Sequence, residues 1–359
     1  MRLAVVALSC PNGGMLHYAS QLANALAKET ETHFFTPLKP ELGPYLSADV
    51  AYHPTIPLSI PGDGWKNAVR QLNPLHHREN ARRINRIKPD IVHFVTEHPA
   101  NSLLMPLLKG KICFTHHDPV RHLGEESRIR QFLNGRSASL SDRVIVHGEA
   151  LRGLLEQRLP SERISVIPHG DYGFLRHFAG ESSEEPMILC FGRLVPYKGV
   201  DVLCKAERFL RGQFSYEVVI AGEGDPSHFE HEIEPNSNIR VINRFLSDPE
   251  VAQLFQRARL VVLPYLEASQ SGVLAIAFAF SKPAIVTHVG GLPEAVGNGK
   301  AGLIVPPNDP EALAEAIRQL WHSPALCARL GAAGQELIEH SIGWPIIARK
   351  HLALYEGIR

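Results

Sequence analysis

Two positively charged side chains, Arg193 and Lys198, follow directly after a short apolar run at residues 187–190. Such a run is typical of a buried parallel strand, and a loop leaving the carboxyl end of that strand opens into the crevice where α/β proteins bind ligands. Arg can grip two oxygens of a diphosphate at once, and Lys adds a mobile point charge. Gly192 and Gly199 flank the pair and let the backbone come close to a ligand. The spacing therefore predicts a site that holds a phosphorylated substrate and stabilises it as a leaving group.

A second polar loop follows the apolar run at residues 260–263 and leads into an apolar helix predicted at residues 275–280. The start of a helix offers free N–H groups to an anion, and Glu267 is an acceptor for sugar hydroxyls. The polar residues Ser269, Gln270 and Ser271 also suit a simple helix cap. A carboxylate at the mouth of a buried helix favours the interpretation as a ligand site.

Further glycine-rich turns follow other predicted strands of the second half. Gly222 and Gly224 surround Glu223; they either leave space for a flat group such as a nucleobase or make an ordinary turn, and the sequence leaves both interpretations open. Glu223 could touch a nucleotide or cap a helix. Glu294, after the glycines at 290–291, suits the positive end of a helix dipole.

In the first half, His117 and Asp118 follow the strand predicted at residues 112–115. A histidine beside a carboxylate can bind a sugar hydroxyl or relay a proton. Gly13 and Gly14 stand between the first strand and the first helix, where backbone N–H groups favour anions, although a tight turn explains the pair equally well. The spacing is not that of a nicotinamide-dinucleotide fingerprint. His169 is interpreted as part of a structural turn, and no metal site is predicted because no third ligand accompanies His117.

The chain of 359 residues is longer than one hydrophobic core usually serves, which predicts two domains. Short apolar runs alternate with helical patterns in two successive series, as expected for two doubly wound parallel sheets. The expected strands are residues 3–8, 32–36, 91–95, 112–115, 143–146 and 164–167, followed by 187–191, 216–221, 239–242, 260–263, 284–287 and 302–305. The acidic, polar stretch 171–185 is predicted to link a first domain, 1–170, to a second, 186–343. A last helix in 344–359 is expected to pack back on the first domain.

Composition excludes several classes of protein. Lys+Arg and Asp+Glu both number 37, so charge gives no reason to expect a nucleic-acid partner. The five cysteines are scattered, as expected for buried thiols of a reducing cytoplasm. The segment 65–88 is different, because Trp65, Val69, Leu72 and Leu75 share a helical face that precedes a basic run. It is interpreted as a solvated helix face or, alternatively, as a peripheral contact with the inner face of a membrane.

Taken in order, these motifs resemble those of the family 4 glycosyltransferases, and the resemblance covers nearly the whole chain. That family implies the GT-B fold, an α/β architecture in which two doubly wound, Rossmann-like domains face an interdomain cleft. It also implies a retaining transfer of a sugar from a nucleotide-diphosphate donor to a hydroxyl of a glycan, lipid-linked or small-molecule acceptor, without a metal or other cofactor. The residues that carry the resemblance lie at 13–14, 117–119, 167–170, 192–199, 222–224 and 290–294.

The resemblance implies a role for each matching position. Catalytic roles fall to Arg193, Lys198, His117 and Glu267, and Asp118 is expected on the acceptor side. The expected donor-binding positions are Gly13, Gly14, Gly192, Gly222, Glu223, Gln270, Ser271, Gly272, Val273, Leu274 and Glu294. The family usually carries a second glutamate, eight positions after the first, which grips the ribose.

In this chain the position of the second glutamate falls on Ala275 or Ile276, neither of which accepts a hydrogen bond through its side chain. Two alternatives stay open. One is a sugar-nucleotide epimerase or a phosphorylase on the same fold. The other, suggested by the missing second glutamate, is a protein that binds a nucleotide sugar without catalysis.

Overall fold

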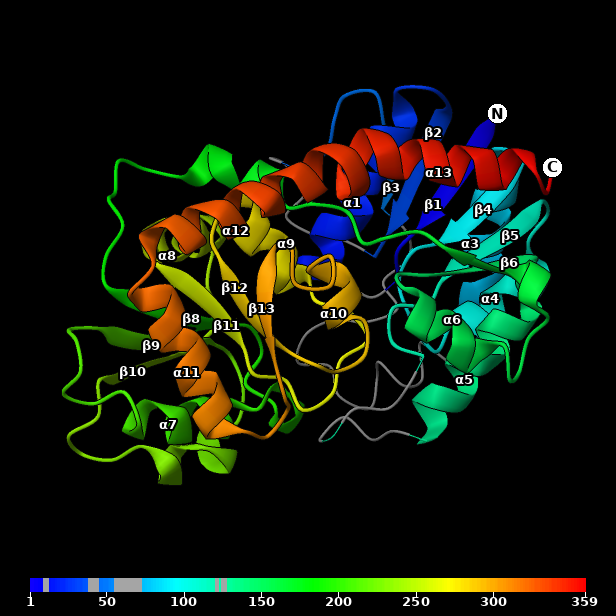
Figure 1. The fold of residues 1–359 in the computed structure, drawn as a ribbon. Coiled ribbons are helices and arrows are strands. Elements are labelled where there is room, and N and C mark those ends of the chain that lie inside the picture. Colours follow the sequence, from blue (N-terminus) through cyan, green and yellow to red (C-terminus); the bar gives the residue numbers. More distant parts are fainter. Residues whose placement is uncertain (9–12, 38–44, 55–72, 120–122, 124–127) are drawn as a thin grey trace. The chain divides into compact units, whose positions relative to one another are not determined.

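The computed structural model describes residues 1–8, 13–37, 45–54, 73–119, 123 and 128–359. They form two compact units (Figure 1). The first contains the described residues up to Gly170 together with Trp344–Arg359, and the second contains Leu123 and Asp171–Gly343. Trp65, Val69, Leu72, Cys10 and the Pro11-Asn12 pair lie outside the described residues.

The first unit is built on a seven-stranded sheet in the order β3-β2-β1-β4-β5-β6-β7, and every strand pair in it is parallel. Its strands are β1 (Arg2–Val6), β2 (Glu31–Thr36), β3 (Ala51–Pro54), β4 (Ile91–Phe94), β5 (Lys111–Thr115), β6 (Arg143–Val146) and β7 (Ile164–Val166). The helices of this unit are α1 (Gly14–Ala27), α3 (Pro74–Arg86), α4 (Asn101–Leu104), α5 (Arg128–Leu140), α6 (Glu149–Leu155) and α13 (Trp344–Glu356). Six of the strands lie where the apolar runs predicted them.

The sequence analysis missed β3. This strand lies at the edge of the sheet, and its four residues are mostly exposed, so no apolar run marks it. Pro54 ends the strand at a position where the missing N–H costs little, as is usual for an edge strand.

The second unit contains a six-stranded parallel sheet in the order β10-β9-β8-β11-β12-β13. Its strands are β8 (Met187–Phe191), β9 (Glu217–Gly222), β10 (Ile239–Asn243), β11 (Leu260–Leu263), β12 (Ala284–Thr287) and β13 (Gly302–Val305). The helices are α7 (Val200–Arg208), α8 (Asp248–Arg257), α9 (Gly272–Ala279), α10 (Leu292–Ala295), α11 (Pro310–Trp321) and α12 (Pro324–Leu337). This strand order is that of the Rossmann fold, so the expected α/β fold with two doubly wound sheets is confirmed.

Each sheet has a hydrophobic core on both of its faces. In β8, Leu189 packs into one core and Ile188 into the other. In β1, Val5 and Ala4 are divided in the same way between the two cores of the first unit. Strands buried on both faces have near-continuous apolar sequences, which explains why the sequence predicted them so well.

Two segments connect the units in sequence: residues 171–185 lead from the first unit to the second, and α13 follows the second unit but belongs to the first. Residues 171–185, expected as a linker, include a short 3-10 helix at Gly173–Phe178. Tyr172 and Leu175 of this segment are buried in the core of the second unit, so apolar packing holds part of it in place. After the second unit, α13 packs against α1, and the hydroxyl of Tyr355 lies 2.6 Å from Nδ1 of the buried His93. The Trp344 ring fills the space that a Cβ on Gly170 would occupy.

The basic segment at 65–88 is described only from residue 73 onward. There α3 begins at Pro74, capped by Asn73, and turns Ala81 and Ile84 inward. Leu75, expected on an apolar face, is 65% exposed. Among the residues that the structure describes, no helix combines the length and the apolar character needed to cross a bilayer.

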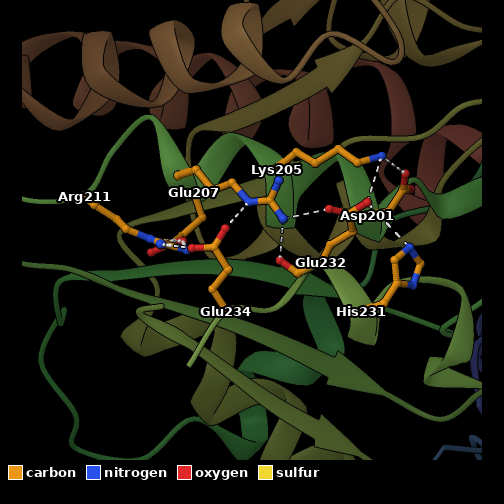
Figure 2. Close-up of polar contacts among 8 residues, drawn as sticks. Asp201, Lys205, Glu207, Arg211, His231, Glu232 and Glu234 are labelled. Carbon is orange, nitrogen blue, oxygen red and sulfur yellow. Dashed lines mark hydrogen bonds and ion pairs between the residues drawn. The ribbon is translucent and has the colours of Figure 1, made fainter. Parts of the chain in front are cut away.

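A network of ion pairs joins α7 to the segment that precedes β10 (Figure 2). At its buried end, the fully buried carboxylate of Glu207 accepts hydrogen bonds from the Arg211 guanidinium at 2.7 and 2.8 Å. It also accepts a bond from the backbone N–H of Asn238 at 3.0 Å. The outer members are exposed to different degrees and include Asp201, Lys205, Arg208, Glu232 and Glu234.

We expect Glu207→Ala to destabilise the second unit by about 1–3 kcal/mol, because it leaves the Asn238 N–H without its carboxylate acceptor. Glu234→Ala removes a carboxylate that is 46% exposed and should cost at most about 1 kcal/mol. Urea denaturation followed by circular dichroism compares the two midpoints. Equal midpoints would contradict a special role for the buried carboxylate.

Candidate functional site

The second sheet has one place where its strand order reverses, between β8 and β11. From there the chain proceeds to β9 on one side and to β12 on the other, so the loops that follow β8 and β11 diverge. Ligands of doubly wound sheets bind at such a switch point, at the carboxyl ends of the strands. The loops with Arg193, Lys198 and Glu267 leave these two strands.

The loop after β8 is fixed by backbone hydrogen bonds on both sides. Leu194 N donates to Glu223 O at 2.9 Å, and Leu266 N donates to Tyr197 O at 2.8 Å. Gly199 has a φ of +62°, and a Cβ there would lie 2.0 Å from Pro264 O. Only glycine fits this turn, so the loop that carries Arg193 and Lys198 has a single defined path.

The glycines at the end of β9 and after β12 also allow close backbone contacts between loops. A Cβ on Gly222 would lie 2.0 Å from Gly192 O, and one on Gly224 would lie 2.1 Å from Leu194 O. A Cβ on Gly290 would lie 1.6 Å from Ala268 O. These glycines allow neighbouring loops to touch through their backbones, a physical reason different from the open space for a nucleobase that the sequence suggested.

Lys198 is positioned by aromatic rings. Its Nζ lies 3.8 Å from the centre of the Tyr265 ring and 5.0 Å from that of Tyr197, distances at which a cation is attracted to a ring face. The Tyr265 ring is buried, and its backbone carbonyl accepts a bond from Thr287 at 2.6 Å. Burial raises the pKa of Tyr265 above its usual range, so the phenol stays neutral beneath the ammonium group.

Tyr265 was not predicted as a site residue. The one signal in the sequence is that both ring positions follow a proline, in Pro196-Tyr197 and Pro264-Tyr265. A repeated dipeptide after two strands does not reveal that the two rings share one ammonium group.

The loop after β11 leads into α9, which begins at Gly272 with Ser271 at its cap position. A Cβ on Gly192 would lie 3.5 Å from Val273 Cγ2, so the turn after β8 lies against the first turn of α9. The N–H groups of a first helical turn favour an anion. Arg193, Lys198 and this helix start therefore place positive charge at the same edge of the sheet.

Gln270 contributes an unusual acceptor to this loop. Within the described part of the chain, its buried amide oxygen Oε1 has no hydrogen-bond partner.

Ala275 and Ile276, where the second family glutamate would stand, are 5% and 6% exposed and belong to the hydrophobic core. Glu267 is half-buried, whereas Glu223 and Glu294 are exposed.

In the first unit, the switch point lies between β1 and β4. Gly13, with a φ of +76°, precedes α1 and needs glycine for that reason, and Gly14 is the first residue of the helix. Glu97, just after β4, accepts bonds from His116 Nδ1 at 2.6 Å and from the backbone N–H of Asp118 at 2.8 Å. Glu97 was not predicted, because its partners stand about twenty positions later in the chain.

His117 is 3% exposed, and both of its ring nitrogens face groups of the same unit. Its Nε2 lies 3.0 Å from Val95 O, and its Nδ1 lies 2.9 Å from Nε2 of His147. The ring of His169, expected only in a turn, lies with its centre 5.1 Å from that of His147. Burial lowers the pKa of His117, while Glu97 and Asp118 act in the opposite direction. No group of three or more metal-ligating side chains converges within the described ranges.

Sequence profiles of two related families match the chain. The profile described as Glycosyltransferase Family 4 matches residues 12–170, and the one described as Glycosyl transferases group 1 matches residues 185–323. The chain belongs to the family 4 glycosyltransferases. It is 28% identical over 229 residues to the D-inositol 3-phosphate glycosyltransferase of Streptomyces avermitilis, a match that covers 60% of this chain and 49% of that relative. It thus spans about half the length of this relative.

Solved structures of this family's fold are similar along the whole chain. Sucrose-phosphate synthase from Thermosynechococcus elongatus has a TM-score of 0.77 at 19% identity, with 99% of this chain and 98% of that one covered. Anabaena HepE in complex with UDP-glucose also has a TM-score of 0.77, at 16% identity, covering 99% of this chain and all of the other. At these identities the similarity establishes the fold.

Gly199→Ala tests the backbone contact between the loops after β8 and β11. Gly212→Ala is the matched control, because the two glycines have similar positive φ angles, +62° and +72°, but nothing lies within 4 Å of the would-be Cβ of Gly212. We expect the Gly199 variant to lose about 1–3 kcal/mol more stability than the control, measured by urea denaturation, because its Cβ overlaps the Pro264 carbonyl. Equal losses would show that the conformation of the backbone, and not the contact, requires glycine.

Proposed function

We propose that this protein transfers a sugar from a nucleotide-diphosphate donor to a hydroxyl of an acceptor, with retention of the anomeric configuration. The observation that carries the proposal is the gathering of Arg193, Lys198 and the start of α9 around the switch point of the second sheet. Membership of the family and the similarity of the fold to a protein solved with UDP-glucose support it.

In the proposed reaction, the bond between the sugar carbon and the β-phosphate oxygen breaks while the acceptor oxygen bonds to the same carbon, and the departing phosphate takes the proton of the acceptor hydroxyl. Negative charge then grows on the departing diphosphate. Arg193, Lys198 and the first N–H groups of α9 stabilise that charge, and because their loops are fixed beforehand, little reorganisation is needed. These cations supply the charge that a divalent metal supplies in other transferases, so we expect turnover without added metal.

The remaining residues are assigned by position. Glu267 is proposed to accept hydrogen bonds from the transferred sugar, and Gly13 and Gly14 are proposed to bind the donor. Asp118 is exposed at the carboxyl end of β5 and is proposed to contact the acceptor, a glycan, a lipid-linked sugar or a small molecule. Peripheral contact with a membrane through residues 65–88 stays a prediction.

Gln270 is proposed to take over the role of the missing second glutamate. Its amide oxygen can accept a hydrogen bond from a ribose hydroxyl, which gives this buried acceptor the partner it lacks among the described residues. With this assignment, the missing glutamate is no longer a reason to favour a protein that binds a nucleotide sugar without catalysis; the turnover experiment decides between the two.

Arg193→Ala and Lys198→Ala should each lower kcat about 10²–10³-fold, the usual effect of removing one preorganised charge-stabilising group. Thermal-shift measurements with UDP, GDP, ADP and dTDP sugars first identify the donor, since a ligand at a hundred times its Kd stabilises by about 2.7 kcal/mol. Nucleotide release with that donor is then followed. Lys300→Ala, at an exposed position of the same unit, is the control. Near-normal turnover in either site variant would refute the mechanism.

Gln270→Leu should raise the KM for the nucleotide sugar roughly tenfold and change kcat much less, because the lost hydrogen bond is present before and during the reaction. The measurement is initial rate against donor concentration. Gln270→Glu offers an acceptor at the same position and should recover most of the affinity. An unchanged KM in the leucine variant would remove Gln270 from the ribose site.

A further inference from the structure

Two buried imidazoles of the first unit, His117 and His147, form a chain of three polar contacts between two backbone carbonyls. The chain runs from Val95 O to His117 Nε2 at 3.0 Å, from His117 Nδ1 to His147 Nε2 at 2.9 Å, and from His147 Nδ1 to Ile167 O at 2.9 Å. The two residues are 3% and 9% exposed. Four strands that are consecutive in the sheet, β4, β5, β6 and β7, lead into the Val95, His117, His147 and Ile167 positions.

When both rings are neutral, this series of three polar contacts lacks one N–H donor. A carbonyl oxygen only accepts hydrogen bonds, so each of the three contacts needs one N–H. Two neutral imidazoles supply two N–H groups. One of the three contacts therefore lacks its N–H: according to the tautomers, the carbonyl of Val95 or of Ile167 faces a nitrogen lone pair, or the lone pairs of the two rings face each other. A third proton, and no more, completes all three hydrogen bonds.

The surroundings determine which ring holds the added charge. Glu97, Asp118 and His116 face His117 from the ends of β4 and β5, and His93 faces it from β4 itself. His169 and His351, from the end of β7 and from α13, face His147. The Tyr18 ring of α1 packs against both imidazoles. Among the described residues, the titratable groups that act on His147 are histidines, whereas the carboxylates of Glu97 and Asp118 favour a charge on His117, so the charge belongs on His117.

We propose that His117 and His147 take up a third proton as one unit, and that His147 is a positioning residue that fixes the tautomer and orientation of His117. The proposal rests on the proposed function where it concerns turnover. Positive charge develops on the sugar ring during glycosyl transfer, so a charged His117, in the catalytic role that the family resemblance implies, opposes it. Turnover should fall on the acid side of its pH profile as the unit gains its proton.

Two substitutions of His147 separate the two contacts of its ring. Asparagine places its amide near the Nδ1 position, so it keeps a donor for Ile167 O and removes the acceptor of His117. Glutamine reaches the Nε2 position, so its amide oxygen accepts from His117 Nδ1. A merely structural role for His147 predicts that the titration midpoint of His117 is similar in the two variants, whereas the proposed role predicts that it differs.

The first experiment needs no activity. The full-length protein is labelled with ¹⁵N-histidine, and its imidazole resonances are assigned through His117→Gln and His147→Gln. We expect a scalar coupling across the hydrogen bond between His117 Nδ1 and His147 Nε2, and one common titration step for both rings. Absence of the coupling, or two independent titrations, would overturn the proposal even if a variant fails to fold.

The pH titration of His117 then provides the comparison between variants. In His147→Asn, the protonated ring lacks one acceptor, so its midpoint should move about 1–2 pH units lower, the equivalent of one hydrogen bond to a charged group. In His147→Gln the midpoint should stay near that of the wild type. Equal shifts in both variants would refute the positioning role.

The acid side of the profile of kcat against pH is measured in the same proteins. It should move with the NMR midpoint, to lower pH in His147→Asn and back toward the wild-type position in His147→Gln. If the wild type forms no product with any donor while the coupling is present, the proposed function fails and the proton-sharing pair remains. If product forms but the acid side is the same in all three proteins, the link between the pair and turnover fails.

Discussion

Contact of backbone with backbone, at places too narrow for a Cβ, is the constraint on which the ligand-binding edge of the second unit depends. Gly222 and Gly224 lie against the carbonyls of the loop after β8, and Gly290 lies against that of the loop after β11. Gly199 then joins these two loops at Pro264. Four loops are thereby fixed as one body, so the backbone that carries Arg193 and Lys198 has one arrangement, as the proposed function requires.

The corresponding edge of the first unit is held by side chains that titrate. Imidazoles bridge the ends of its strands, and Glu97 ties the His116–Asp118 turn to β4. Both sheets have a switch point at the same place in their strand order, but within the described residues the buried, hydrogen-bonded imidazoles lie in the first unit, and burial lowers the pKa of His117 and of His147. Acidification below neutral pH therefore acts on this edge of the first unit.

The strands could be predicted from the sequence because both sheets are covered on both faces, which leaves long apolar runs. Their carboxyl ends then located the loops with Arg193, Lys198 and Glu267. The edge strand β3 lacks such a run and was missed. Tyr265, Glu97 and His147 were missed for another reason: each acts through a partner in another loop, and His147 meets His117 across thirty positions of sequence. Contacts of this kind depend on the order of the strands in the sheet, which a local sequence pattern does not indicate.

The absence of the second glutamate follows from the way α9 is packed. All of its residues from Leu274 to Ala279 are buried, and the helix lies against α12 as well as in the core beside the sheet. A carboxylate at 275 or 276 would have to leave water and enter that core without a cation to pair with, at a cost of several kcal/mol. In the proposed function, recognition of the ribose is therefore assigned to the loop before the helix. Gln270 suits that position, because a neutral amide oxygen provides an acceptor without the cost of burying a charge.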